Sequence, residues 1–166
     1  MKFLAIFAAL ALVTSDRVTY YLQFQYFDFG APGTIVNTDF MREENFKSET
    51  YWISDISGDV KPKHTYYLDN GGLSAVEGTS HGKAWWANVL GVEDSRTAPL
   101  FQFTDYNHLT ADSHHFGRNT DGYLTYYGSR KFDLCNDVLH IHNFKHNLIC
   151  QPIYVYLPAV GKSLEV

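Results

Sequence analysis

The amino-acid sequence predicts an all-β protein, an antiparallel β-sandwich or barrel with one disulfide and at most one short helix. Short stretches in which apolar and polar residues alternate recur along the 166-residue chain, and a period of two is typical of half-buried strands. Turn-forming Gly, Asn, Asp and Pro separate these stretches. Aromatic residues, which strands favour, make up 16% of the sequence.

Residues 1–15 are expected to be a signal peptide, and residues 16–166 a single β domain. A positive charge at Lys2 precedes an apolar run, residues 3–13, that is too short to span a bilayer. Small residues end this segment at Ser15, where we expect cleavage. A buried N-terminal strand or helix is the alternative interpretation. Export would place the mature protein outside the cell or in the cell wall.

The sequence of the first third of the domain predicts three strands and the one helix. Residues 18–28 alternate well and predict a strand, and residues 34–37 predict a short second one after a Gly/Pro break. Residues 38–49 carry acidic side chains early and a lysine late, which favours a short helix. A polar loop fits these residues nearly as well. Residues 50–56 predict the next strand.

The clearest turn signal is Asp-Asn-Gly-Gly at residues 69–72, which predicts a hairpin between strands over residues 64–68 and 73–76. Asn and Gly tolerate the positive φ that such turns require. Residues 84–89 and 100–103 predict two further strands.

The longest polar stretch, residues 105–122, predicts a loop, and loops of this length are often functional or mobile. After it we expect four strands, over residues 123–127, 131–135, 138–142 and 148–157. Cysteines occur only in this last region, at two positions.

Cys135 and Cys150 are expected to form a disulfide. An oxidising compartment leaves two cysteines one intramolecular pairing. In the chain-entropy model a loop of about 15 residues closed in this way contributes roughly 3 kcal/mol. Two buried free thiols are the alternative.

The charge pattern and the missing motifs argue against several classes of function. The formal net charge is −5 and Lys and Arg are scattered, so we expect neither nucleic acid nor a membrane as partner. The sequence has no Gly-x-Ser-x-Gly elbow and no Gly-rich phosphate loop. Its carboxylates show no spacing that would pair them for glycoside hydrolysis. We therefore expect no enzymatic activity and no cofactor.

His140 and His142 are the candidates for metal binding. They alternate with Leu139 and Ile141, so a strand would place both imidazoles on one face. His-x-His on a strand can present two ligands to zinc or copper. The sequence does not indicate a third ligand, so we favour a solvated strand face that carries two histidines.

Trp85, Trp86, Tyr126 and Tyr127 are the candidate carbohydrate-binding residues. A strand would turn at least one ring of each pair away from the core, and the same holds for Tyr154 with Tyr156. Flat aromatic faces stack on sugar rings through apolar and CH–π contacts. Partial coverage of both sheet faces is the alternative interpretation.

Three local motifs lie within residues 121–158: Asp121-Gly122-Tyr123-Leu124, Phe132-Asp133-Leu134-Cys135 and Cys150-Gln151-Pro152-Ile153-Tyr154-Val155. They resemble the Asp-Gly-x-Leu strand start, the aromatic-x-x-Cys and the Cys-x-Pro-Val/Ile ending of the C-terminal domain of the fungal PIR-type cell-wall proteins and related small secreted mannoproteins. The family's Gln-rich repeats, its dibasic processing site and two of its four cysteines are missing here. The resemblance therefore implies a secreted β domain, wall-associated or released, without implying covalent attachment to wall glucan, and it supplies no catalytic residues.

These observations predict a secreted, non-enzymatic protein of the cell wall or cell surface. It would be structural, or would bind wall polysaccharide weakly through exposed aromatics. A secreted effector or toxin-like β protein that acts on another cell is the alternative, and a glycan-active or histidine-metal enzyme is the third hypothesis. We expect binding around Trp85-Trp86 and over residues 105–120.

Overall fold

The computed structural model describes residues 18–26, 33, 35–42, 51–55, 62–77, 84–90, 100–104, 109–136, 138–142 and 149–160. The expected signal peptide, residues 1–15, lies outside these ranges, and so does the turn expected over residues 143–147. Within the described ranges, no helix has the length and the apolar character that a membrane crossing requires.

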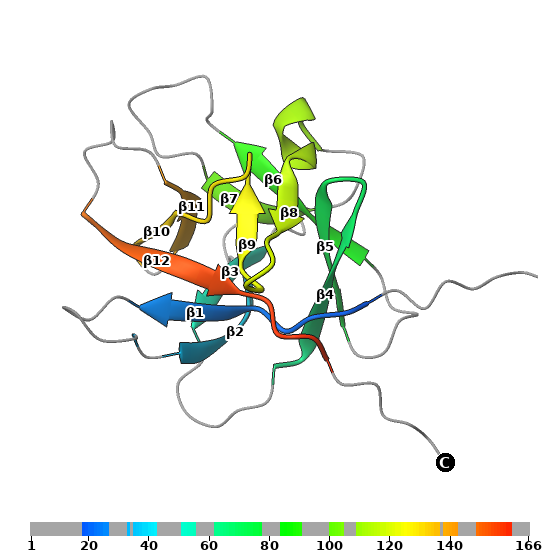
Figure 1. The fold of residues 1–166 in the computed structure, drawn as a ribbon. Coiled ribbons are helices and arrows are strands. Elements are labelled where there is room, and N and C mark those ends of the chain that lie inside the picture. Colours follow the sequence, from blue (N-terminus) through cyan, green and yellow to red (C-terminus); the bar gives the residue numbers. More distant parts are fainter. Residues whose placement is uncertain are drawn as a thin grey trace, which may run out of the picture.

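One antiparallel sheet of ten strands dominates the described chain (Figure 1). Its strands follow the order β11-β10-β12-β1-β2-β3-β7-β6-β5-β4. Their bounds are β1 Gln23–Tyr26, β2 Ile35–Arg42, β3 Tyr51–Asp55, β4 His64–Asp69, β5 Gly72–Glu77, β6 Ala84–Leu90, β7 Leu100–Thr104, β10 Phe132–Cys135, β11 Val138–Ile141 and β12 Cys150–Tyr156. His140 on β11 also pairs with Leu100 on β7. The sheet thus curls back into sandwich-like layers rather than a closed barrel, and the predicted all-β antiparallel fold is confirmed.

A smaller unit lies between β7 and β10 in the sequence. It consists of the 3-10 helix η2, Ala111–His114, and a two-stranded sheet of β8, Phe116–Arg118, and β9, Leu124–Tyr126. In Figure 1, β9 runs across the face of the large sheet. Tyr123, directly before β9, forms an isolated bridge with Tyr156 of β12. Backbone hydrogen bonds join the units. Phe116 N–H donates to the Gly71 carbonyl at 2.8 Å, and Leu157 N–H donates to the Gly122 carbonyl at 2.9 Å.

The prediction of a loop over residues 105–122 is therefore wrong for residues 111–114 and 116–118, which form η2 and β8. Residues 105–108 lie outside the described ranges. Apolar periodicity is weak over residues 110–114 because hydrogen bonds from Thr110 and Ser113 hold these residues against β6.

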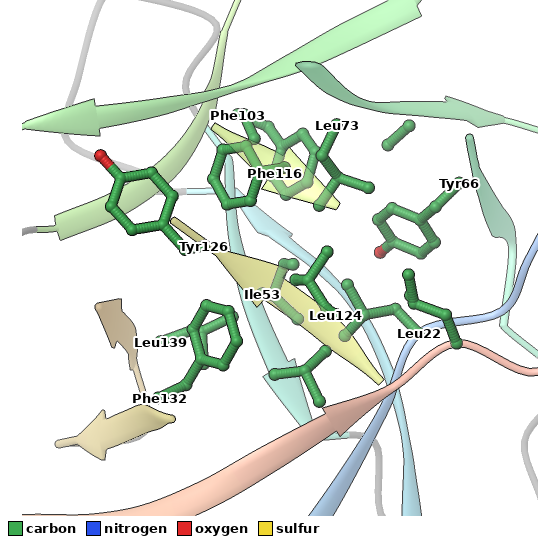
Figure 2. Packing of buried hydrophobic residues seen from close by; sticks show 14 of the residues in the cluster. Leu22, Ile53, Tyr66, Leu73, Phe103, Phe116, Leu124, Tyr126, Phe132 and Leu139 are labelled. Atoms are coloured by element: carbon green, nitrogen blue, oxygen red, sulfur yellow. The ribbon is translucent and has the colours of Figure 1, made fainter. Parts of the chain in front are cut away.

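One hydrophobic cluster joins the two sheets (Figure 2). Phe116, Leu124 and Tyr126 from the small sheet pack with buried residues of the large sheet, among them Phe103 and Phe132. Burying a large apolar side chain contributes about 1.5–3 kcal/mol relative to leaving it exposed. The small sheet is therefore part of the core and closes one side of it.

The predicted hairpin is confirmed between β4 and β5. Asn70 and Gly71 form its two-residue loop with φ of 48° and 80°, as a type I′ turn requires. A β-carbon on Gly71 would also meet the backbone carbonyl of His114. Gly71 therefore serves two purposes: it permits the turn, and it lets the end of η2 approach the hairpin.

The predicted helix over residues 38–49 is wrong for residues 38–42, which belong to β2 and pair with β3. Thr38 is fully buried, and its hydroxyl donates to the Leu22 carbonyl at 2.7 Å. Pairing of residues 38–42 with β3, which continues the strand that residues 35–37 form beside β1, outweighs the weak helical pattern. Residues 43–49 lie outside the described ranges.

The expected disulfide is present. Cys135 on β10 and Cys150 on β12 lie directly opposite each other in the strand register, with an S–S distance of 2.00 Å. The disulfide crosslinks the neighbouring strands β10 and β12 and closes a covalent loop that includes β11.

Candidate functional site

Exposed rings gather where β9 ends. Tyr127 is 61% exposed, and the ring of His115 stacks on it with centroids 3.7 Å apart and planes 20° apart. Tyr126 lies nearly perpendicular to Tyr127, with centroids 4.9 Å apart. The Tyr127 hydroxyl donates to Oδ1 of Asp112 at 3.3 Å. We call Asp112, His115, Tyr126 and Tyr127 the aromatic shelf.

A tight turn holds Tyr127 in place. Tyr126 and Ser129 exchange backbone hydrogen bonds of 2.8 and 3.0 Å, and the two residues between them, Tyr127 and Gly128, have φ of 48° and 76°. The Tyr127 N–H also donates to the His115 carbonyl at 2.9 Å. Positive φ is uncommon for a bulky side chain, and such backbone outliers cluster at functional sites. The turn presents the Tyr127 ring outward at an energetic cost.

A buried polar network anchors η2, which carries Asp112 and precedes His115. Ser113 is fully buried; its hydroxyl donates to Oδ1 of Asn88 at 2.9 Å and accepts from the Val89 N–H at 3.2 Å. Thr110 donates its N–H to Asn88 Oδ1 and its hydroxyl to the Val89 carbonyl, both at 3.0 Å. The network fixes one side of the aromatic shelf to β6.

The pKa values of both shelf phenols are raised above the ordinary tyrosine value. Loss of solvation, followed by the charge of Asp112 and its hydrogen bond, raises the pKa of Tyr127. Burial, followed by the charge of Asp112 and by Tyr127, raises the pKa of Tyr126. A phenol with the ordinary tyrosine pKa is already neutral at pH 7, so the upward shifts extend the neutral form to more alkaline pH.

Tyr126 forms the inner wall of the shelf. Its side chain is buried and belongs to the core cluster, and Figure 2 shows its hydroxyl directed away from that cluster. Among the described residues this buried hydroxyl has no hydrogen-bond partner. The ring face of Tyr126 is covered, so Tyr127 and His115 supply the accessible rings.

The two tryptophans lie apart from each other. Trp85 faces the core and is buried, which removes its ring from the surface. Trp86 points to the other face of β6, is half-buried, and packs edge-on to Tyr67 with ring centroids 6.0 Å apart. A β-carbon on Gly72 would meet the Trp86 ring at 2.8 Å, so glycine permits this ring to approach the hairpin closely.

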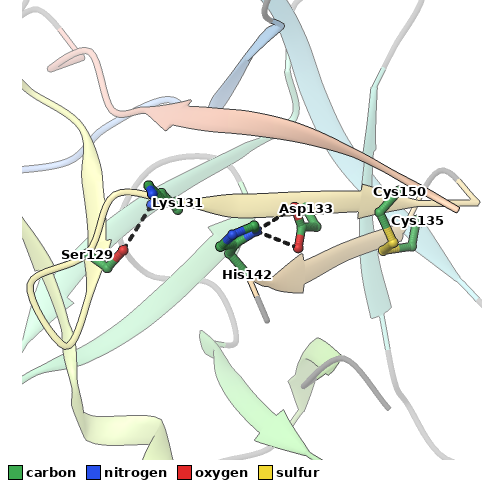
Figure 3. Close-up of polar contacts among 6 residues, drawn as sticks. All are labelled: Ser129, Lys131, Asp133, Cys135, His142 and Cys150. Carbon is green, nitrogen blue, oxygen red and sulfur yellow. Dashed lines mark hydrogen bonds and ion pairs between the residues drawn. A yellow bond between two sulfur atoms is a disulfide. The ribbon is translucent and has the colours of Figure 1, made fainter. Parts of the chain in front are cut away.

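The expectation that His140 and His142 lie on a solvated strand face is wrong for His140, which is buried. Asp133, which was not predicted to be a site residue, lies on the same face. Asp133 is buried and is the cross-strand partner of His140, while Nδ1 of His142 lies 2.8 Å from both Asp133 carboxylate oxygens (Figure 3). The alternation Phe132-Asp133-Leu134 could have placed Asp133 on the histidine face of an adjacent strand. In the described part of the chain, no three His, Cys, Asp or Glu side chains converge as a metal site would need.

The chain matches no protein-family model, no curated protein and no solved structure in the three comparisons made with known proteins. The geometry of the described residues is thus the basis for a functional proposal.

Proposed function

We propose that this is a secreted, non-enzymatic protein of the cell wall or cell surface that binds polysaccharide through the aromatic shelf. The observation that carries the proposal is Tyr127: an exposed ring, fixed by a positive-φ turn, stacked on His115 and hydrogen-bonded to Asp112.

The chemistry of the shelf suits a sugar ring. The C–H face of a sugar stacks on a flat aromatic face through apolar and CH–π contacts. Asp112 accepts from Tyr127 through one oxygen, and carboxylate oxygens have further lone pairs that can accept from sugar hydroxyls. Because the turn and the His115 stack already order the ring, binding does not have to freeze it.

The shelf is suited to binding rather than to hydrolysis. It contains one carboxylate, Asp112, whereas most glycoside hydrolases use a pair of carboxylates that flank the scissile bond. The Tyr127 hydroxyl already donates to this carboxylate.

Secretion rests on two supports. The disulfide between Cys135 and Cys150 suits an oxidising compartment, and residues 1–15 have the composition of a signal peptide. The resemblance of residues 121–158 to fungal cell-wall proteins is the reason for proposing the wall. An effector that binds the glycans of another cell could use the same shelf. Fractionation of the producing cells separates the two, because a wall protein stays with the wall and an effector accumulates in the medium.

The test is retention of the purified chain on insoluble β-glucan, chitin and mannan. Tyr127→Asn is the informative variant because Asn tolerates positive φ, so the turn is kept while the ring is lost. A stacking contact of about 0.5–1.5 kcal/mol corresponds to roughly 2- to 12-fold weaker binding. Tyr127→Phe should retain most of the binding. Ile149→Asn removes another exposed apolar side chain, 93% exposed, and should change nothing.

Two results would overturn the proposal. One is retention on none of the three polymers; the other is Tyr127→Asn binding as tightly as the unmodified chain.

A further inference from the structure

Tyrosines also gather on the outward face of β12. Ile153 and Val155 point into the core and are buried, so the alternating Tyr154 and Tyr156 point away from it. Both tyrosines remain partly exposed. Gln25 on β1 lies directly opposite Tyr154 in the strand register.

A third ring, Tyr123, is fixed over this pair. Tyr123 forms an isolated bridge with Tyr156, and its ring centroid lies 5.5 Å from that of Tyr154 and 5.4 Å from that of Tyr156. Its hydroxyl donates to Oε1 of Gln25 at 2.8 Å. The three rings therefore form an ordered surface, which we call the tyrosine strip.

Arginines flank the strip at both ends. The guanidinium of Arg130 lies 4.4 Å from the Tyr154 ring centroid and 5.8 Å from that of Tyr123. At the other end, a β-carbon on Gly122 would meet both Arg118 Nη2 and the Tyr156 ring within 3 Å. Glycine at this position, with φ of 91°, lets Arg118 and Tyr156 approach each other.

The two arginines differ in what they can offer a ligand. Arg118 Nε donates to the Leu157 carbonyl at 3.1 Å, so part of its guanidinium is engaged. Arg130 is exposed and makes no ion pair with any described carboxylate. A guanidinium stacked on an aromatic ring keeps its N–H edges free, and its fork matches the oxygens of a carboxylate or phosphate. Arg130 is thus an oriented anion receptor in a chain whose formal net charge is −5.

The strip adjoins the aromatic shelf. Arg130 follows Tyr127 by three residues, and three residues of extended chain span at most about 11 Å. The turn that presents Tyr127 closes at Ser129, directly before Arg130. A polymer stacked on Tyr127 therefore comes within reach of Arg130 and the strip.

We propose that Arg130, oriented by Tyr154 and Tyr123, is an anion-binding subsite that makes this protein selective for acidic glycans, whose residues bear carboxylate or phosphate groups. This inference rests on the proposed function of the aromatic shelf. The shelf supplies the stacking contact common to all sugars, and the strip selects the charged ones.

The experiment measures equilibrium binding of the full chain to two matched pairs of polymers. Polygalacturonate is compared with its methyl ester, and phosphorylated mannan with the same mannan after phosphatase treatment, at low and at 0.15 M salt. We expect the acidic member of at least one pair to bind about tenfold or more tightly. We expect this preference to shrink as salt screens the exposed guanidinium. The pair that shows the preference identifies the anionic group.

The variants assign the preference to Arg130. Arg130→Gln should reduce the affinity of the protein for the acidic polymer to its affinity for the neutral form. The affinity for the neutral form should stay the same. Arg130→Lys should retain only part of the preference because an ammonium lacks the planar fork. Lys63→Gln removes the same charge at an exposed position before β4 and should leave the preference intact. Circular dichroism and thermal melting check that each variant is folded.

The two proposals fail differently. Equal binding of acidic and neutral polymers, with Tyr127→Asn still weakening both, would overturn the anion subsite and leave the shelf standing. A preference that survives Arg130→Gln or disappears in Lys63→Gln would also overturn it. Binding to none of these polymers, or binding that Tyr127→Asn does not alter, would overturn the proposed function itself.

Discussion

Ser113 offers the sharpest test of how the aromatic shelf is attached to the sheet. It is fully buried and accepts from the Val89 N–H at 3.2 Å while donating to Asn88 at 2.9 Å. Ser113→Ala leaves a backbone N–H without its acceptor, and an unsatisfied buried donor costs about 1–3 kcal/mol. Asn88 Oδ1 still accepts from the Thr110 N–H at 3.0 Å. We therefore expect a loss near the middle of that range, roughly 2 kcal/mol.

The measurement is thermal or urea unfolding of the purified chain. For a domain of this size a loss of about 2 kcal/mol lowers Tm by about 4–8 °C. Ser74→Ala is the matched control: Ser74 is also fully buried, but its hydroxyl makes one bond, 3.1 Å to the Trp85 carbonyl. A carbonyl has a second lone pair, so we expect a smaller loss there, about 0.5–1.5 kcal/mol. If Ser113→Ala costs no more than Ser74→Ala, the reasoning about the network is wrong.

Three further predictions concern the disulfide, the β4–β5 hairpin and the aromatic shelf. Cys135→Ser should destabilise the protein by about 3 kcal/mol, measured by urea unfolding, and an unchanged midpoint would contradict the entropic argument. Gly71→Ala should lower the stability of the protein more than Gly128→Ala. Both glycines have positive φ, but only at Gly71 would an added β-carbon also meet the backbone of η2, whereas nothing lies within 4 Å of a β-carbon on Gly128. Equal Tm values for the two variants would refute this. Asp112→Asn should lower the pKa of Tyr127, which is raised in the folded protein. Any stability that the neutral phenol contributes is present below the ordinary tyrosine pKa and is lost as the pH rises through the raised pKa. Ultraviolet titration of the phenols at alkaline pH checks it, and an unshifted curve would remove Asp112 as a cause.

The strands could be predicted because their signals are local. The alternation around Phe24 and Val155 follows the pleat, and both side chains are buried as a period of two requires. The hairpin at Asn70-Gly71 was identifiable because few residues tolerate the φ of a type I′ turn.

The remaining features depend on contacts that no local pattern encodes. Residues 38–42 form a strand because they pair with β3, while the preceding residues 35–37 pair with β1. η2 is held by Asn88, more than twenty positions earlier in the chain. Which ring of a pair is exposed also depends on the whole fold: Trp86 and Tyr127 face outward, and Trp85 and Tyr126 face inward. The aromatic pairs could therefore be identified from the sequence, but the accessible member of each could not.

The bond between Val89 and Ser113 has a consequence for hydrogen exchange. Val89 lies in β6, yet its N–H donates to the hydroxyl of Ser113 in η2 and its carbonyl accepts from the hydroxyl of Thr110. This amide can exchange with solvent when η2 lifts away, without any opening of the sheet. A polymer that bridges Tyr127 and the strip would hold the segment down and slow exchange at Val89. That single amide thus reports on the docking of the shelf separately from the stability of the sheet beneath it.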